Sequence, residues 1–126
     1  MLGDCKFLKQ GSVMKFETLD VWKRSAKLAS EVYQYFACCN DYGFKDQITR
    51  SCLSVSSNVA EGWERSSNKD RARFLDIAKG SLAEFISQTY IGQKIGYIDI
   101  LQSKKWLAES QEIAAMLAAL KQKILL

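Results

Sequence analysis

The chain has 126 residues, which suits one domain with its own core, and its lack of proline favours uninterrupted helices over a turn-dense β fold. The lack of histidine excludes histidine-based nucleophilic triads and the common metal-ligand sets, and the four cysteines show no C-x-x-C spacing. A formal charge of +4, no secretory signal and no apolar run of ~20 residues predict a soluble, cytoplasmic protein that tolerates an anionic partner without requiring one.

Residues 1–13 show no hydrophobic periodicity, and Met14 offers a second plausible start. We therefore predict a flexible N-terminal extension over 1–13 and one domain over 14–126. The first helix is expected to begin after an N-cap at Thr18 and to end before the turn residues 40–43. Its apolar positions alternate in steps of three and four, which predicts a buried seam: Leu19, Trp22, Ala26, Ala29, Tyr33 and Phe36.

The second helix carries two regular stripes. The apolar stripe is Phe44, Ile48, Cys52, Val55 and Val59, and the polar stripe is Gln47, Arg50, Ser54, Asn58 and Glu61. One interpretation of the polar stripe is a solvated face. The other is a polar network shared with another helix or subunit, in which Glu84 would satisfy Arg50 and Asn58.

Gly62 suits the end of the second helix, and Ser67 with Asp70 resembles a capping box that starts a third helix near Asn68. That helix is expected to run to a cap at Gly96. It contains Gly80 and Gly92, each of which costs about 1 kcal/mol relative to alanine, so a close helix approach or a kink is expected there.

A fourth helix follows a cap at Asp99 or Ser103, with Trp106, Ile113, Leu117, Leu120 and Ile124 on its apolar stripe. The predicted fold is an all-α, up-down-up-down four-helix bundle.

Two segments, Ser57-Asn58-Val59-Ala60-Glu61-Gly62 and the run from Phe74 to Ser81, carry a family resemblance, together with residues 19–22, 42–44, 47–48, 50–51 and 96–97. They resemble the four-helix-bundle proteins encoded in intervening sequences of ribosomal RNA genes. The pattern usually has proline where this chain has Ser56 and a second basic residue where it has Thr49, which weakens any role for a basic pair in the second helix.

The resemblance implies a ring-shaped homopentamer. A related branch is the accessory variability determinant of diversity-generating retroelements, which binds nucleic acid and a reverse transcriptase. The partners implied are therefore further copies of the chain, RNA or DNA, and a protein such as a reverse transcriptase. The resemblance implies no membrane partner.

Basic residues form the candidate nucleic-acid surface: Lys23, Arg24, Lys27, Arg65, Lys69, Arg73, Lys104 and Lys105, with a further pair at Lys121 and Lys123. Several have an acid at helical spacing, such as Asp20 with Arg24 and Asp70 with Arg73, so solvated salt-bridged faces are the competing interpretation. Multiplication of the charge in a ring favours phosphate binding.

Trp63 follows Gly62 and is the candidate oligomer-interface residue. Glu61 and Glu84 are better explained as structural hydrogen-bonding groups than as acid-base catalysts. The sequence thus predicts a non-enzymatic, homo-oligomeric bundle without metal or cofactor, associated with nucleic acid or acting as a scaffold. The alternative is a protein-interaction adaptor without nucleic-acid affinity.

Overall fold

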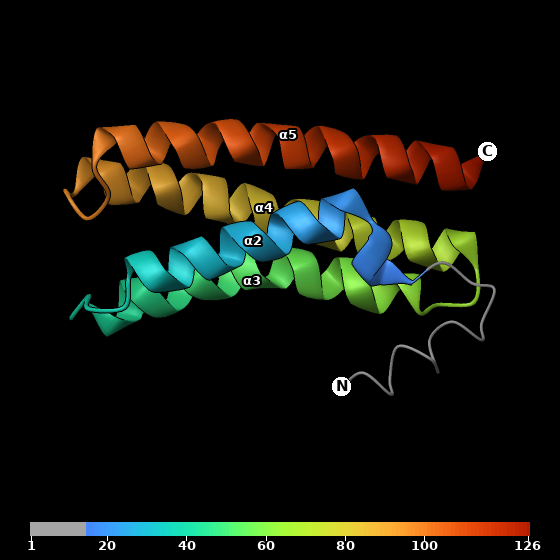
Figure 1. Cartoon of the computed structure of the whole chain (residues 1–126), viewed down its shortest axis with the longest axis horizontal. Helices are drawn as coiled ribbons and strands as arrows, with labels where there is room; N and C mark the ends of the chain where they lie inside the picture. The colour runs from blue at the N-terminus through green and yellow to red at the C-terminus, as the bar shows by residue number, and fades with distance from the viewer. Residues whose placement is uncertain (1–14) are drawn as a thin grey trace.

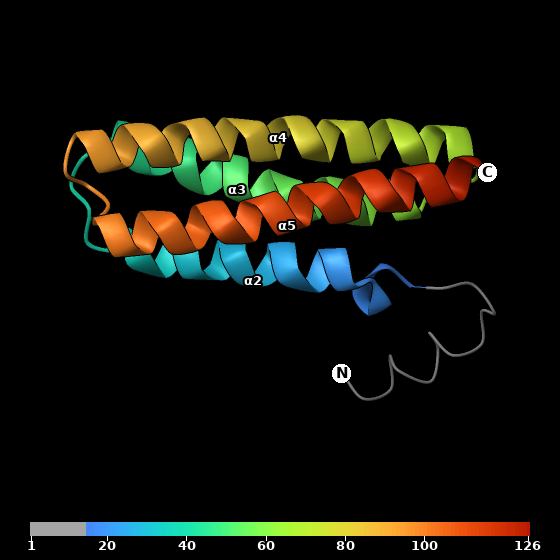
Figure 2. The ribbon, with the colours of Figure 1, turned by 90° about the horizontal axis from the view of Figure 1, so that it is seen from above.

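The computed structural model describes residues 15–126, and the predicted extension over 1–13 lies outside the described residues. A short 3-10 turn, η1 (Phe16–Thr18), precedes four α-helices: α2 (Asp20–Tyr35), α3 (Tyr42–Trp63), α4 (Asn68–Lys94) and α5 (Ile100–Leu125). Consecutive helices run antiparallel side by side (Figures 1 and 2). Within residues 15–126 the structure is all-helical, as predicted, and no helix there is both long and apolar enough to cross a membrane.

Side-chain caps start three of the four helices. Asp41, Ser67 and Asp99 each accept a hydrogen bond from the backbone N–H three residues later, at 3.1, 3.1 and 2.8 Å. The predicted caps at Ser67 and Asp99 are thus confirmed. The predicted cap at Thr18 is wrong: its hydroxyl donates to the carbonyl of Lys15 within η1, and α2 starts without a side-chain cap.

Glycines have three different roles along α3 and α4. Gly96 has φ +82°, and the N–H groups of Tyr97 and Gly96 close a Schellman motif onto the carbonyls of Gly92 and Gln93, so the predicted cap is confirmed. At Gly92 an added Cβ would lie 3.0 Å from Phe44 Cζ of α3, which fits the predicted close helix approach, and 2.5 Å from Ile98 Cδ1 in the connection to α5.

The other two glycines differ from expectation. Gly80 is exposed, and an added Cβ there would meet nothing within 4 Å, so it marks no close approach within the chain. Gly62 does not end α3, which continues to Trp63. It is buried where α3 crosses α4, and an added Cβ would lie 2.5 Å from the Cβ of Phe74.

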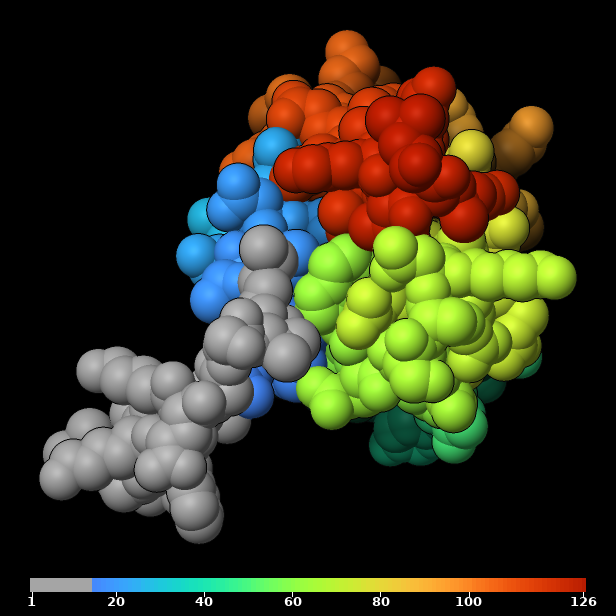
Figure 3. Space-filling model, turned by 90° about the vertical axis from the view of Figure 1, so that its right-hand side faces the viewer, coloured from blue at the N-terminus to red at the C-terminus, as the bar shows by residue number. Residues whose placement is uncertain are grey.

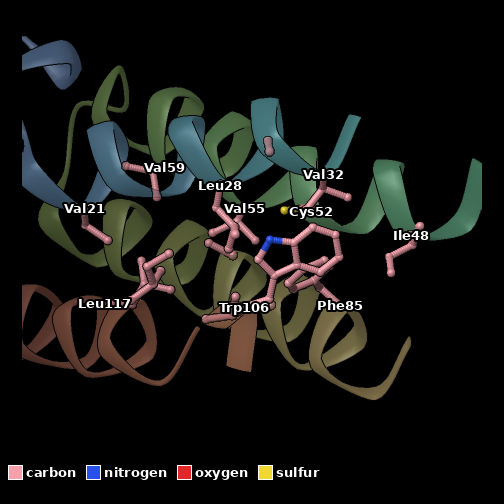
Figure 4. Packing of buried hydrophobic residues seen from close by; sticks show 14 of the residues in the cluster. Val21, Leu28, Val32, Ile48, Cys52, Val55, Val59, Phe85, Trp106 and Leu117 are labelled. Carbon is pink, nitrogen blue, oxygen red and sulfur yellow. The ribbon is translucent and has the colours of Figure 1, made fainter. Parts of the chain in front are cut away.

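The core runs the length of the bundle, with Trp106 of α5 near its middle (Figure 4). The Trp106 ring packs edge-on against Tyr35 at 5.1 Å and lies 5.9 Å from the Phe85 ring, centroid to centroid. Leu28, Val32, Cys52 and Val55 surround it from α2 and α3 (Figure 4). Each fully buried side chain of this size contributes roughly 1.5–3 kcal/mol to folding, which makes this layer the main source of stability.

The buried face of α2 differs from the predicted seam. The helix buries Val21, Ser25, Leu28, Ala29 and Val32, followed by Phe36 just beyond its end. Of the predicted seam, Trp22 and Ala26 are only half-buried and Tyr33 is 43% exposed. The helix is therefore rotated by about one residue from the expected orientation, which leaves an apolar edge at the surface beside α3.

Candidate interaction surfaces

An uncharged groove of about 640 Å³ lies between α2 and α3. Alanine and serine side chains form much of it, and larger side chains stand among them. The lining residues are Phe16, Trp22, Ala26, Ala29, Ser30, Tyr33, Gln34, Leu53, Ser56, Ser57 and Ala60. The chain is 25% charged, yet none of the lining residues among 15–126 is charged, which is a strong departure from an ordinary solvated surface.

A second hollow of about 730 Å³ continues the groove toward the start of α3 and shares Tyr33 and Leu53 with it. Its lining includes Lys45, Asp46 and Arg50, so the apolar floor has a charged border at this end. This layout, an apolar floor and a polar rim, is typical of a surface that contacts another macromolecule.

A short polar network connects α3 to α4. The Ser54 and Ser81 hydroxyls lie 2.9 Å apart, and Asn58 Nδ2 donates to the Ser54 carbonyl at 2.8 Å and to its hydroxyl at 2.9 Å. The Ser51 hydroxyl donates to Gln88 Oε1 at 2.6 Å. The network interpretation is thus correct for Ser54 and Asn58, while Ser51 and Gln88 were missed because Ser51 lies outside the regular polar stripe.

The rest of the predicted network lies at the surface. Arg50 exposes 75% of its side chain and pairs with Asp46 on its own helix at 3.1 Å. Glu61 pairs with Arg65 at 3.1 Å, and Gln47 and Glu84 are exposed. Within one chain, the expected satisfaction of Arg50 and Asn58 by Glu84 is therefore wrong: Arg50 pairs with Asp46 and Asn58 with Ser54, while Glu84 on α4 is exposed.

The basic cluster at the start of α4 is largely neutralised by acids. Arg65 lies between Glu61 and Asp70, and Arg73 pairs with Asp70 at 3.0 Å. Both guanidinium groups also lie over the Phe74 ring, 4.6 and 4.8 Å from its centroid. This cluster lies at the end of the bundle where the C-terminus also lies (Figure 3).

Arg71 belongs to this end as well, with its guanidinium 5.5 Å from the centre of the half-buried Trp63 ring. Sequence reasoning missed this contact, for which the only signal was a second basic residue eight positions after a tryptophan. The role of Trp63 at an oligomer interface stays a prediction.

Arg24 is held in an ion-pair clamp between α2 and α5. Its Nη2 lies 2.6 Å from Glu109 Oε1 and 2.6 Å from Glu112 Oε1, and its Nε donates to Glu109 Oε2 at 2.9 Å. These hydrogen bonds raise the pKa of Arg24 above its usual range and lower the pKa of Glu109. The local pair expected between Asp20 and Arg24 is replaced by this clamp, so Arg24 has little charge left for a ligand.

Five lysines of the predicted surface are exposed and form no ion pair with residues 15–126: Lys23, Lys27, Lys69, Lys104 and Lys105. Of the further pair, Lys121 binds Asp76 of α4 at 3.0 Å. The structure brings two of the predicted clusters together, because Lys27 and Lys105 line one hollow of about 450 Å³ between α2 and α5. Glu31 and Glu109 line the same hollow, so its positive charge is partly offset.

Within residues 15–126, no three histidine, cysteine, aspartate or glutamate side chains are grouped so that they could hold a metal ion. Within residues 15–126, the four α-helices and their shared core define an all-helical protein, with an uncharged groove on one face and exposed lysines elsewhere. The chain belongs to the family of 23S rRNA-intervening sequence proteins, which it matches over residues 17–119.

A solved structure of similar fold is a protein of unknown function from the S23 ribosomal protein family of Bacteroides thetaiotaomicron. It superposes with a TM-score of 0.72 at 23% identity, over 80% of this chain and 97% of that one. A comparison with curated proteins finds no match.

Proposed function

We propose that this protein is a non-enzymatic, homo-oligomeric scaffold that associates with RNA or DNA through phosphate contacts. The observation that carries the proposal is that the five lysines of the candidate surface, Lys23, Lys27, Lys69, Lys104 and Lys105, are exposed and form no ion pair with residues 15–126. An ammonium group with no protein partner remains available to neutralise a phosphate and to release the counterion condensed there.

Assembly supplies the strength that one chain lacks. A net charge of +4 per chain is modest, but several copies in one particle sum their fields. The homopentameric ring implied by the family resemblance would carry about five times the charge of one chain. Contacts of this kind recognise the backbone and not the base, so we expect binding to depend little on nucleotide sequence.

The test separates the lysines from the arginines. Binding of fluorescent single-stranded RNA and duplex DNA is measured by anisotropy between ~50 and ~300 mM salt. A variant with all five lysines changed to glutamine should bind weakly and show a flatter log-log salt dependence. The matched control Arg65→Gln with Arg73→Gln should change the slope less, because acids already neutralise these arginines.

Two results would overturn this proposal. One is no retention of either nucleic acid by the unmodified protein at ~50 mM salt. The other is an equal loss of slope in the lysine and arginine variants, which would show that the free lysines have no special part. Failure to bind nucleic acid in an intact oligomer would favour the adaptor alternative, for which the uncharged groove between α2 and α3 is the supporting observation.

A further inference from the structure

We propose that the groove between α2 and α3 receives the exposed edge of α4 from a second copy of this chain, centred on Ile77 and Glu84. This inference rests on the homo-oligomer of the proposed function and assigns its interface. It makes the contact heterologous: within residues 15–126, the groove is lined by η1, α2 and α3, whereas the edge belongs to α4.

The edge of α4 has features that packing within the chain does not explain. Ile77 is 41% exposed, and Glu84 forms no ion pair with residues 15–126. Gly80, between them, faces open space although a glycine there costs about 1 kcal/mol relative to alanine. A second copy that packs against this edge would cover Ile77 and would benefit from the close approach that Gly80 permits.

The groove and the α4 edge lie at the same position along the bundle axis. The antiparallel helices α3 and α4 pair Gly62 with Phe74 and Ser54 with Ser81. Ile77 therefore lies between these pairs, level with Ser57 and Ala60 of α3, whose small side chains line the groove.

Opposite charges, those of Glu84 and Arg50, also lie at the same position along the bundle axis. Glu84 lies about one turn beyond Ser81, and Arg50 lies one turn before Ser54, so the two are level. When a second copy is placed beside the first with no shift along the bundle axis, its Ile77 lies over the small residues of the first copy's groove. Its Glu84 then lies beside Arg50 of the first copy, at the charged rim. Within residues 15–126, the only ion-pair partner of Arg50 is the exposed Asp46 on its own helix, so Arg50 is available for this contact.

The relative direction of the two faces determines what kind of assembly the contact builds. Seen along the bundle, α2 and the start of α4 lie on opposite sides (Figure 3), and α3 contacts both. The groove and the α4 edge thus flank α3 and face different directions. Repetition of such a contact turns each copy relative to the last, and the assembly becomes a ring if the turn closes or a filament if it does not.

The experiment measures molecular mass by light scattering and dissociation by sedimentation over a range of concentrations. Ile77→Gln should raise the dissociation constant at least tenfold with unchanged helical circular dichroism. Ile95→Gln, which alters an isoleucine of similar exposure at the end of α4, is the matched control and should leave it unchanged. Glu84→Arg and Arg50→Glu should each weaken assembly, and the double variant should recover it.

The outcomes separate this interface from the wider proposal. An oligomeric unmodified protein whose dissociation is unaffected by Ile77→Gln and by both charge reversals would overturn the interface and leave homo-oligomerisation standing. A monomeric unmodified protein at micromolar concentration would overturn both. Recovery of assembly in the double variant is the result that a general loss of stability could not produce.

Discussion

The contact between Gly62 of α3 and Phe74 of α4 provides a direct test of how the bundle is packed. In Gly62→Ala, the new Cβ would lie 2.5 Å from Phe74 Cβ and 3.3 Å from Phe74 Cγ. The Cβ of Phe74 is fixed to the α4 backbone, so no side-chain rotation relieves the overlap. Ordinary carbon contacts begin near ~3.5 Å, and the two helices must therefore separate by about 1 Å.

Two opposing effects set the size of the change. Alanine is favoured over glycine in a helix interior by about 1 kcal/mol, whereas overpacking of a well-packed core costs typically ~1 to 3 kcal/mol. Separation of the helices also loosens the neighbouring contacts of Phe74, so we expect a net loss of about 1 to 2 kcal/mol. For a domain of this size, that lowers Tm by roughly 4 to 8 °C.

The matched control is Gly80→Ala on the outer surface of α4, where an added Cβ meets nothing within 4 Å. Its helix propensity gain of up to about 1 kcal/mol should raise the free energy of unfolding. Both variants are compared by urea denaturation and by thermal melting followed by circular dichroism, at several concentrations so that assembly is held constant. A shift of the same sign in both variants would refute the close-contact reasoning.

Two further outcomes follow from pKa values. Hydrogen bonding to Arg24 lowers the pKa of Glu109 below its ordinary 4.5. The ionised Glu109 carboxylate therefore stabilises the fold above pH 4.5, and this stabilisation is lost as the pH falls through the lower pKa of the folded state. Glu109→Gln should flatten the acid side of a plot of unfolding free energy against pH. Burial raises the pKa of the Cys52 thiol to about 12. Iodoacetamide at pH 8 should therefore modify the exposed Cys38 in the folded protein and should modify Cys52 only after denaturation. Mass spectrometry of the peptides would measure both modifications.

Local signals made much of the fold predictable. The Ser67 and Asp99 caps and the glycine at position 96 are read within a few residues of the helix end they control, and each is found where expected. The apolar stripes of α3 and α5 were largely predictable from their three- and four-residue spacing: Ile48, Cys52, Val55 and Val59 of α3 and Trp106, Ile113 and Leu117 of α5 are buried, although α5 buries Ser103 and Ser110 as well. Each of these features is determined by residues within one or two helical turns of it in the sequence.

The buried face of α2 shows where such reasoning fails. Two neighbouring stripes of α2 are both apolar enough to be buried. The stripe that faces the core contains Ser25, whereas the stripe that lies nearer the surface contains Trp22 and Tyr33. Hydrophobic periodicity therefore placed Leu19, Ala29 and Phe36 correctly in the core and placed Trp22, Ala26 and Tyr33 wrongly. The orientation depends on how α2 packs against α3 and α5, and the local pattern does not encode which helices become its neighbours.

Charge pairing was unpredictable for a similar reason. Asp70 with Arg73 lie on one helix, and their pairing is visible in the sequence. Arg24 instead binds Glu109 and Glu112 on a helix 85 or more positions away, a choice that depends on which helices become neighbours. The sequence predicted a candidate nucleic-acid surface of lysines and arginines, whereas the ion pairs of the arginines leave the lysines as its candidates.

The two proposals join at the level of the assembly. The uncharged groove and the α4 edge involve α2, α3 and α4, whereas Lys104 and Lys105 lie on α5, and Lys27 faces the hollow between α2 and α5. Assembly through the groove would leave these three lysines exposed while it multiplies them in one particle. Ile77→Gln keeps every lysine and adds no charge, so dissociated copies should bind RNA more weakly and with a flatter salt dependence than the unmodified protein. Equal RNA affinity in the dissociated variant would show that phosphate binding belongs to single chains and that assembly serves another purpose.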